Sequence, residues 1–364
     1  MRLEQYIEVL SELNLEGLFL HNCPNKVHLL ELTEFMGGDW AIAISLRRRE
    51  SLAIFVRESL TTEEIWSSSP FKTYVQTFSS LRDLFRKVGR FVRRKSIGMG
   101  FAWENEATVR QLKTEGVEVT DISAKLLTLR EIKTEEEQKI VKQASFATNQ
   151  AFLALIEYLQ EIERGFREIE IANKIQKEMI RNGAEKLAFP TSVVSGVSPS
   201  PQQTWRLPTN RKIAKGAIIL LRFGAQISYY KSALHRIILT QKKPQDIILS
   251  YDIADMVNKE HQNFLRTLIS DKKIRDVIEP NKSKYPELLK KGQWILPMGH
   301  GIGLEEVEYP LLLPEEDRKL NKNTILSAGK GFMIRKKIIV LVRDMVIIKR
   351  PIEILTPSFP VVKL

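Results

Sequence analysis

Side chains that could carry catalysis or bind a metal are few in this sequence, which has five histidines and one cysteine. His21 and His28 flank Cys23, but one thiol and two imidazoles at this spacing match no known pattern of metal ligands. His235 and His300 lie in the segments SALHRIIL and PMGHGIGLEEVEYP. Because imidazole titrates near neutral pH, these two histidines are the candidates for proton transfer.

The other reactive or aromatic side chains are expected to be structural. A single cysteine excludes an intrachain disulfide and a cysteine metal cage, and a buried apolar role is expected for Cys23. His261 falls in NKEHQNFL on a predicted helix, where a surface position is expected. Four aromatic side chains are expected to pack in the core or at its rim: Trp205, Trp294, Tyr229 and Tyr230.

The chain is basic, with a net charge of +12 over 364 residues. Such a charge favours nucleic acid or acidic partners. The basic residues are spread widely, however, and three short clusters are not interleaved with aromatic residues: Arg47 to Arg49, Arg93 to Lys95 and Arg335 to Lys337. We therefore expect solvated faces and no nucleic-acid partner. No apolar run approaches the roughly 20 residues of a membrane span, so we expect a cytoplasmic protein and no membrane partner.

The first third of the chain alternates helical and strand patterns. Helices are predicted over 3–12, 80–92 and 104–116, with strands between them. DWAIAISL and SLAIFV form a predicted hairpin across the turn at 47–50. This alternation is typical of an α/β domain with a mixed sheet.

The remaining two thirds combine long helices with strands in another order. Thr134 and Glu137 form a predicted capping box at the start of a long helix. A second helix ends at Gly183, a third covers about 246–269, and strands are predicted at 191–196, 217–228, 232–240, 324–334 and 337–349. The sequence therefore predicts an α+β domain.

Five phrases occur in order over about 128–350: LREIKTEEEQKIVKQA, NGAEKLAFPTSVVSG, LLRFGAQISYYKSALHRIIL, PMGHGIGLEEVEYP and VLVRDMVIIK. In this order they resemble the creatinase/aminopeptidase P/prolidase family. A weaker resemblance covers the N-terminal third. It implies a creatinase/prolidase-like α/β domain over 1–127, followed by a pita-bread domain over 128–364.

The chemistry of that family uses two divalent cations, held by two aspartates, one histidine and two glutamates. The resemblance places these ligands at Arg222, Ala233, His300, Ala328 and Arg343, with Asp344 replacing Arg343 if the alignment shifts by one residue. Only His300 keeps its ligand type. Two positions have become guanidinium groups, which stay protonated and repel cations. The resemblance therefore implies a lost metal site, no cofactor and no metallopeptidase activity.

Two interpretations of the altered site use the arginines as fixed cations. In the first, Arg222 and Arg343 pair with Glu308, Asp344 or Glu306 and fill the former metal pocket, because buried charges must be paired. In the second, the pocket stays partly open and the guanidinium groups bind an anionic ligand through two parallel hydrogen bonds. The binding residues would then be Arg222, Arg343, His300 and Glu308.

A third interpretation is metal-free hydrolysis of a small amide or amidine, as in creatinase. His300 and His235 would transfer protons and Glu308 would orient them. Overall similarity alone would class the chain as an Xaa-Pro peptidase, which its site residues contradict. The preferred prediction is a catalytically inactive homologue that serves as a binding or scaffolding protein. We expect a homodimer, or a heterodimer with an active paralogue, and a peptide or anionic ligand.

Overall fold

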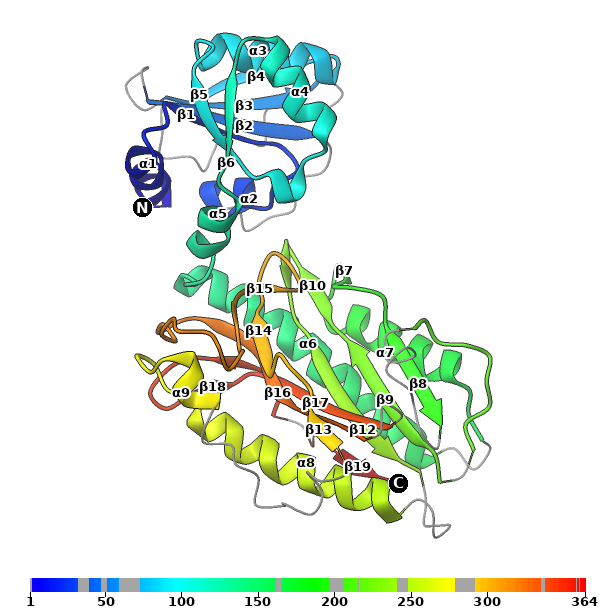
Figure 1. Ribbon diagram of the computed structural model, residues 1–364. Helices are drawn as coiled ribbons and strands as arrows, with labels where there is room; N and C mark the ends of the chain where they lie inside the picture. The colour runs from blue at the N-terminus through cyan, green and yellow to red at the C-terminus, as the bar shows by residue number, and fades with distance from the viewer. Residues whose placement is uncertain are drawn as a thin grey trace. The chain divides into compact units, whose positions relative to one another are not determined.

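The computed structural model describes residues 2–31, 39–46, 51–58, 73–161, 165–196, 206–214, 216–240, 248–278, 292–334, 338–357, 359 and 361–364. The chain divides into two compact units, Met1–Arg130 and Glu131–Leu364 (Figure 1). The division falls close to the boundary predicted after residue 127. Trp205 and the basic clusters at 47–49 and 335–337 lie outside the described residues.

The first unit is built on a six-stranded mixed sheet in the order β4-β3-β2-β1-β5-β6. Its strands are β1 (Gly17–Leu20), β2 (Trp40–Ser45), β3 (Ser51–Arg57), β4 (Thr73–Phe78), β5 (Ser96–Met99) and β6 (Glu118–Asp121). The pairs β1/β2 and β2/β3 are antiparallel, and the others are parallel. The hairpin predicted over 39–56 is thus confirmed.

Two helices of the first unit begin at residues whose side chains satisfy free backbone N–H groups. Ser80 accepts a hydrogen bond from the Asp83 N–H at the start of α3, and Asn105 accepts one from Thr108 at the start of α4. The helices are α1 (Arg2–Glu12), α2 (Asn25–Leu30), α3 (Leu81–Phe91), α4 (Glu106–Thr114) and α5 (Ser123–Leu129), with a short 3₁₀ turn at Phe101–Trp103.

The histidines and the cysteine of this unit have structural partners. His28 Nδ1 lies 2.8 Å from the Tyr6 hydroxyl, and Cys23 Sγ donates to Asn25 over 3.3 Å. His21 Nε2 lies 3.0 Å from an Asp39 carboxylate oxygen. Cys23 is buried, as predicted.

The second unit begins at the predicted capping box. The Thr134 N–H donates to Glu137 over 2.7 Å, and the Glu137 N–H donates to the Thr134 hydroxyl over 3.2 Å. The helices that follow are α6 (Glu135–Glu161), α7 (Glu168–Arg181), α8 (Ile248–Thr267) and α9 (Ile274–Ile278). Among the residues that the structure describes, no helix is long and apolar enough to cross a membrane.

A ten-stranded sheet forms the centre of the second unit. Its main path runs β15-β14-β16-β17-β12-β9-β8, while β13, β18 and β19 pair with β16, β17 and β12. The strands are β8 (Ser192–Gly196), β9 (Ile218–Phe223), β12 (Leu234–Leu239), β13 (Gly292–Trp294), β14 (Gly299–Gly301), β15 (Glu308–Leu311), β16 (Ile325–Ile334), β17 (Ile338–Ile347), β18 (Glu353–Ile354) and β19 (Val361–Lys363). A smaller sheet pairs β7 (Lys186–Leu187), β10 (Ala225–Ile227) and β11 (Tyr230–Lys231).

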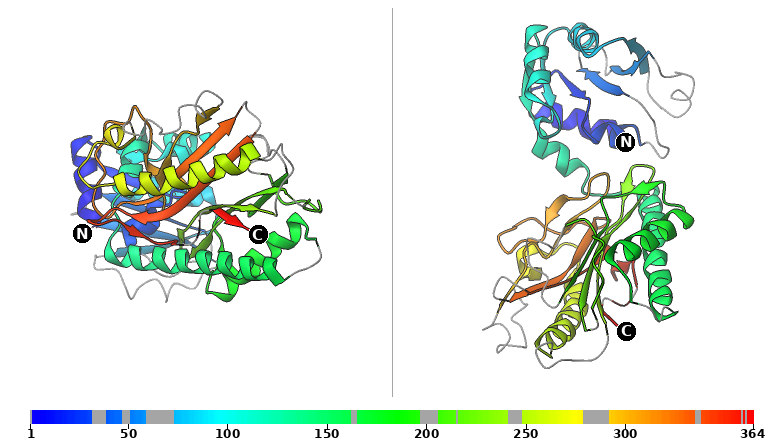
Figure 2. Two further views of the ribbon diagram at one scale, coloured as in Figure 1. Left: turned by 90° about the horizontal axis from the view of Figure 1, so that it is seen from below. Right: turned by 90° about the vertical axis from the view of Figure 1, so that its right-hand side faces the viewer.

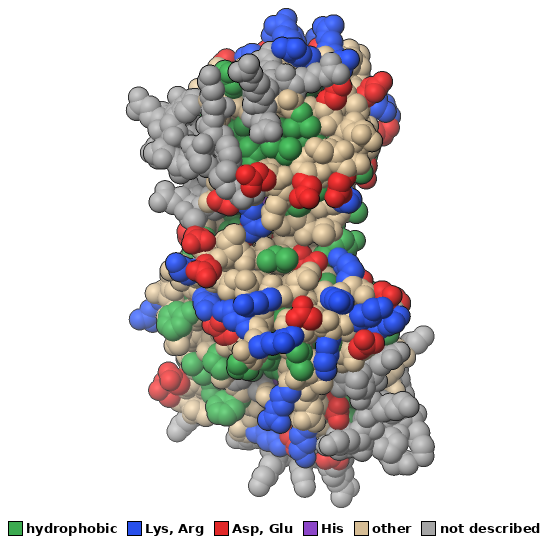
Figure 3. Space-filling model, turned by 90° about the vertical axis from the view of Figure 1, so that its left-hand side faces the viewer, with side chains coloured by type: hydrophobic (Ala, Val, Ile, Leu, Met, Phe, Trp, Pro, Cys, Tyr) green, Lys and Arg blue, Asp and Glu red, His purple; other side chains and the backbone are tan. Residues whose placement is uncertain are grey.

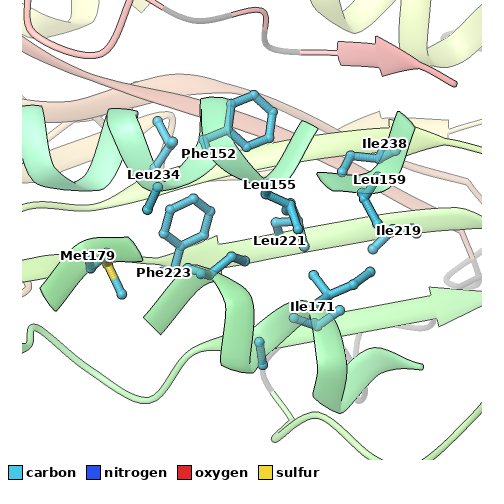
Figure 4. Packing of buried hydrophobic residues seen from close by; sticks show 14 of the residues in the cluster. Phe152, Leu155, Leu159, Ile171, Met179, Ile219, Leu221, Phe223, Leu234 and Ile238 are labelled. Atoms are coloured by element: carbon cyan, nitrogen blue, oxygen red, sulfur yellow. The ribbon is translucent and has the colours of Figure 1, made fainter. Parts of the chain in front are cut away.

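Two groups of helices cover different halves of this sheet (Figure 2). Helices α6 and α7 pack on β9 and β12 through Phe152, Ile171, Leu221, Phe223 and Leu234 (Figure 4). Helix α8 packs on β16 and β17 through an apolar cluster that includes Phe264, Leu265, Leu326, Ala328 and Val346. Because side chains alternate along a strand, the residues between these core positions point away from the helices.

Candidate functional site

Three cationic or imidazole side chains lie in one row across three neighbouring strands. His235 on β12 is directly opposite Arg222 on β9 and Arg343 on β17. Leu221 and Phe223, which flank Arg222, pack in the core with α6 and α7. Arg222 and the row it belongs to therefore point to the other side of the sheet. We call this side, defined by Arg222, His235 and Arg343, the inner face.

Ala233, His300 and Ser327 complete the inner face. Ser232 points toward α6, where its hydroxyl lies 2.6 Å from the Thr148 hydroxyl, so Ala233 faces the opposite way. His300 on β14 is opposite Ser327 on β16. Both neighbours of Ser327 along β16 belong to the core under α8. The structure thus brings together the predicted positions 222, 233, 300 and 343.

Ala328 does not belong to this group, although the family resemblance placed a metal ligand at this position. Its side chain is fully buried in the cluster with Phe264 and Leu265 of α8, and it pairs with Asp344 across the ladder. The family resemblance thus placed this ligand position one residue too far along β16. A shift of one residue moves a side chain to the other face of a sheet. Ser327 is the β16 residue beside His300.

Asp344 also lies on the face toward α8, so it is not a ligand of the inner face and does not pair with Arg343. It accepts a hydrogen bond from Arg236, and its other oxygen lies 2.7 Å from Nε2 of His261. His261 is fully buried, so the surface position expected for it is wrong. Burial raises the pKa of Asp344, but Arg236 and His261 outweigh this and hold it at about 2. This network is structural.

Arg222 has the partner that the filled-pocket interpretation requires. Its guanidinium is in direct contact with the Glu306 carboxylate. It also lies over the ring of Phe189, with 3.9 Å between the guanidinium carbon and the ring centroid. Both charged side chains are partly exposed, at 16% for Arg222 and 29% for Glu306. The predicted pairing of Arg222 with Glu306 is therefore present.

Arg343 is more deeply buried than Arg222, and its hydrogen-bond acceptor is an uncharged backbone carbonyl. The residue is 8% exposed, and its Nη2 donates to the Pro297 carbonyl over 2.7 Å. Its Nε has no hydrogen-bond partner in the part of the chain that the structure describes. Burial, together with the like charge of Arg222, lowers the pKa of Arg343 to about 10. The guanidinium still carries a positive charge at neutral pH.

Both inner-face histidines are neutral at pH 7. Burial and the charge of Arg343 lower the pKa of His300 to about 4. Burial, Arg343 and Arg222 hold the pKa of His235 well below its ordinary value. His300 donates from Nδ1 to the Gly301 carbonyl over 2.9 Å, which fixes the tautomer.

Glu308 takes part in a buried ion pair that the sequence did not suggest. Its Oε2 lies 2.9 Å from Nζ of Lys133, and both side chains are nearly inaccessible to solvent. The backbone N–H of Glu305 donates to its other oxygen over 3.2 Å. Since 175 residues separate Lys133 from Glu308, no local pattern could have joined them. Arg236 was missed for the same reason, because its partner Asp344 is remote in sequence.

These side chains do not fit the two divalent cations that the family resemblance implies. Divalent metals of this kind prefer carboxylate oxygens or neutral imidazole, and their ligands must converge. The inner face presents two guanidinium groups, two imidazoles, a hydroxyl and a methyl group. Within the described ranges, no group of three or more His, Cys, Asp or Glu side chains could hold a metal ion.

Comparison with known proteins agrees with this fold. Residues 139–350 match metallopeptidase family M24, and the chain belongs to this family. The second unit has its pita-bread fold, as expected, and the α+β architecture is confirmed.

Two relatives and one solved structure show how far the similarity extends. An uncharacterized peptidase of Methanocaldococcus jannaschii is 30% identical over 251 residues, which cover 68% of this chain and 69% of the relative. The Xaa-Pro dipeptidase of Pyrococcus horikoshii is 24% identical over 361 residues, 96% of this chain and 94% of that protein. The structure of an Xaa-Pro dipeptidase from Bacillus anthracis superposes with a TM-score of 0.86 at 20% identity, covering 100% of this chain and 99% of the other.

Proposed function

We propose that this chain is a metal-independent, catalytically inactive member of family M24 that serves as a binding or scaffolding protein. The observation that carries the proposal is the row Arg222–His235–Arg343 on the inner face. Where the family resemblance implies carboxylates around two cations, this chain places two fixed cations in one row, on either side of His235. Two permanent positive charges repel a divalent metal at any accessible pH.

The paired charges nearby support a structural role for the altered site. Arg222 is matched by Glu306, and Lys133 by Glu308, so each pair contains one cation and one carboxylate. Fixed cations of the protein thus stand where metal charge would otherwise balance carboxylates. Pairing of this kind leaves neither charge of a pair uncompensated, without a metal. A homodimer, or a complex with an active paralogue, is the form of scaffolding that we propose.

The geometry of His300 argues against the alternative of a metal-free hydrolase. A general acid or base works best with a pKa near the operating pH. The pKa of His300 is about 4, and its Nδ1 is engaged by the Gly301 carbonyl. Glu308, the predicted orienter, forms its buried ion pair with Lys133 instead.

Metal retention is the direct test of the proposal. After incubation with excess Mn²⁺ or Co²⁺ and desalting, we expect fewer than about 0.1 metal equivalents per chain, because the arginines exclude cations. We also expect no cleavage of a Xaa-Pro dipeptide. Elemental analysis and a proline-release assay measure these quantities.

An active Xaa-Pro dipeptidase, such as that of Pyrococcus horikoshii, carried through the same steps provides the positive control. Two equivalents of metal together with dipeptide cleavage would refute the proposal. Metal-free cleavage of a small amide, lost on His300→Gln substitution, would favour the hydrolase instead.

A carboxylate-binding protein is the second candidate function, and Arg343 favours it. Its buried Nε has no hydrogen-bond partner among the described residues, and a nearby arginine repels it. A small carboxylate would satisfy both the charge and the free donor.

Acetate is the probe for this second candidate. At equal ionic strength, replacing chloride by 100 mM acetate should raise Tm by about 2 °C in the parent protein, because a bound ligand stabilises the folded state. The R343M variant should show no such gain. The R181M variant, whose arginine is 65% exposed on α7, is the matched control and should respond like the parent. An equal gain in R343M, or none in the parent, excludes carboxylate binding at Arg343.

A further inference from the structure

A second charged site lies elsewhere in the second unit, in a pocket of about 410 Å³ beside the first turns of α6. Helix α6 contributes Glu135, Gln138, Lys139 and Lys142 to its wall. These positions are spaced by three and four residues, so they share one face of the helix. The pocket is within the size range of small-molecule sites.

The opposite wall comes from both ends of the hairpin formed by β16 and β17. Lys322 and Asn323 lie just before β16, and Lys349 follows β17. Asn323 has a φ of 68°, a left-handed conformation that asparagine tolerates better than most residues. Its backbone is fixed on both sides, since its N–H donates to Ile348 over 2.9 Å and its carbonyl accepts from Lys133 over 3.2 Å. This wall is therefore a defined part of the fold.

Two of the pocket's lysines are held in place by a carboxylate at the edge of the sheet. Glu353 on β18 lies 2.5 Å from Nζ of Lys142 and 2.6 Å from Nζ of Lys349, through different oxygens. Lys139 and Lys322 form no ion pair with any residue in the described part of the chain. Glu353 thus positions one pair of ammonium groups and leaves the other pair for a ligand.

The charge balance of the pocket is strongly positive. Its wall carries four lysines and one glutamate, which is a net charge of +3, and Glu353 reduces this to +2. Lysine and arginine side chains also gather on this side of the second unit in Figure 3. A concave wall with several like charges concentrates ions of the opposite sign.

We propose that this pocket binds a small anion with two or more phosphate groups. Lysine ammonium groups are compact point charges with three donors each, which suits the many oxygens of a phosphate chain. Lys139 and Lys322, which Glu353 leaves for a ligand, come from separate segments and can contact successive phosphates, whereas a single carboxylate would leave one of them unmatched. This proposal is independent of the proposed function, because the pocket shares no residue with the inner face.

Isothermal titration calorimetry with inorganic tripolyphosphate at 50 mM salt tests the proposal. We expect one binding site per chain and an affinity that falls as salt is raised, because charge attraction is screened. The K139Q/K322Q variant should bind at least about tenfold more weakly, since it loses the two ammonium groups that have no internal partner.

The K259Q/K272Q variant is the matched control, because it removes the same charge from exposed positions of the same unit. It should keep the parent affinity within about twofold, and both variants should keep the parent Tm. ATP in place of tripolyphosphate separates the two sources of phosphate. Equal affinities identify the phosphate chain as the ligand, and tighter binding of ATP identifies a nucleotide. Absence of binding to either compound, or equal losses in the two variants, overturns the proposal.

Discussion

Returning carboxylates to the inner face is expected to create a Mn²⁺ site in a protein that we propose to bind no metal. The variant R222D/A233D/S327E/R343E places four carboxylates around His300, all on one side of the sheet. Carboxylate oxygens and a neutral imidazole are ligands that Mn²⁺ accepts. We expect about one to two retained equivalents and a Tm that rises on adding Mn²⁺, because a bound metal stabilises only the folded state. Elemental analysis and thermal unfolding measure both.

The control variant for this prediction differs at one position, since its fourth carboxylate is placed at residue 328 and not at residue 327. In R222D/A233D/A328E/R343E the fourth carboxylate enters the core under α8, beside Phe264 and Leu265. Burying an unpaired carboxylate there should cost several kcal/mol and contribute nothing to metal binding. Lower metal retention and a lower Tm than in the S327E variant are therefore expected. If the A328E variant holds as much Mn²⁺ as its counterpart, the assignment of Ser327 to the inner face is wrong.

The fold could be predicted because its signals are local. Capping residues such as Thr134 and the apolar periodicity of α6 depend on neighbours only a few residues apart. The order of five short phrases then identified the pita-bread domain, and family M24 confirms it. The prediction that residues 222, 233 and 343 replace metal ligands also came from these phrases, through the family resemblance.

The partners of the charged residues could not be predicted, because they depend on contacts remote in sequence. Arg222 meets Glu306 across 84 residues, and Lys133 meets Glu308 across 175. The side of the sheet to which Ser327 and Ala328 point could not be predicted either. It depends on the strand register, since a shift of one residue moves a side chain to the other face of the sheet. The burial of His261 could not be predicted for a similar reason. Its helix was predicted, but the face that α8 turns toward Asp344 was not.

Removing the Asp344 carboxylate is expected to produce the largest loss of stability from a single substitution at the charged residues of the second unit. Arg236 is fully buried and contacts Asp344 directly, and the Thr356 hydroxyl donates to the same carboxylate oxygen over 2.8 Å. D344A would leave the Arg236 cation without its carboxylate, a change that typically costs about 3–5 kcal/mol. D344N keeps the size and some hydrogen bonds and should cost less. Denaturant unfolding at pH 7 measures the difference.

Besides losing stability at pH 7, the D344A variant should show a changed dependence of its free energy of unfolding on acid pH. The pKa of Asp344 is held at about 2, below the ordinary value of 3.8. A carboxylate with a depressed pKa stabilises the fold fully above pH 5 or so, and this contribution disappears as the pH falls through about 4 toward 2. In D344A that part of the acid dependence should be missing. D255A, which removes an exposed carboxylate paired with Lys363, is the matched control and should cost less than about 1 kcal/mol. A loss as small as this in D344A would mean that the buried Arg236–Asp344–His261 network does not stabilise the sheet.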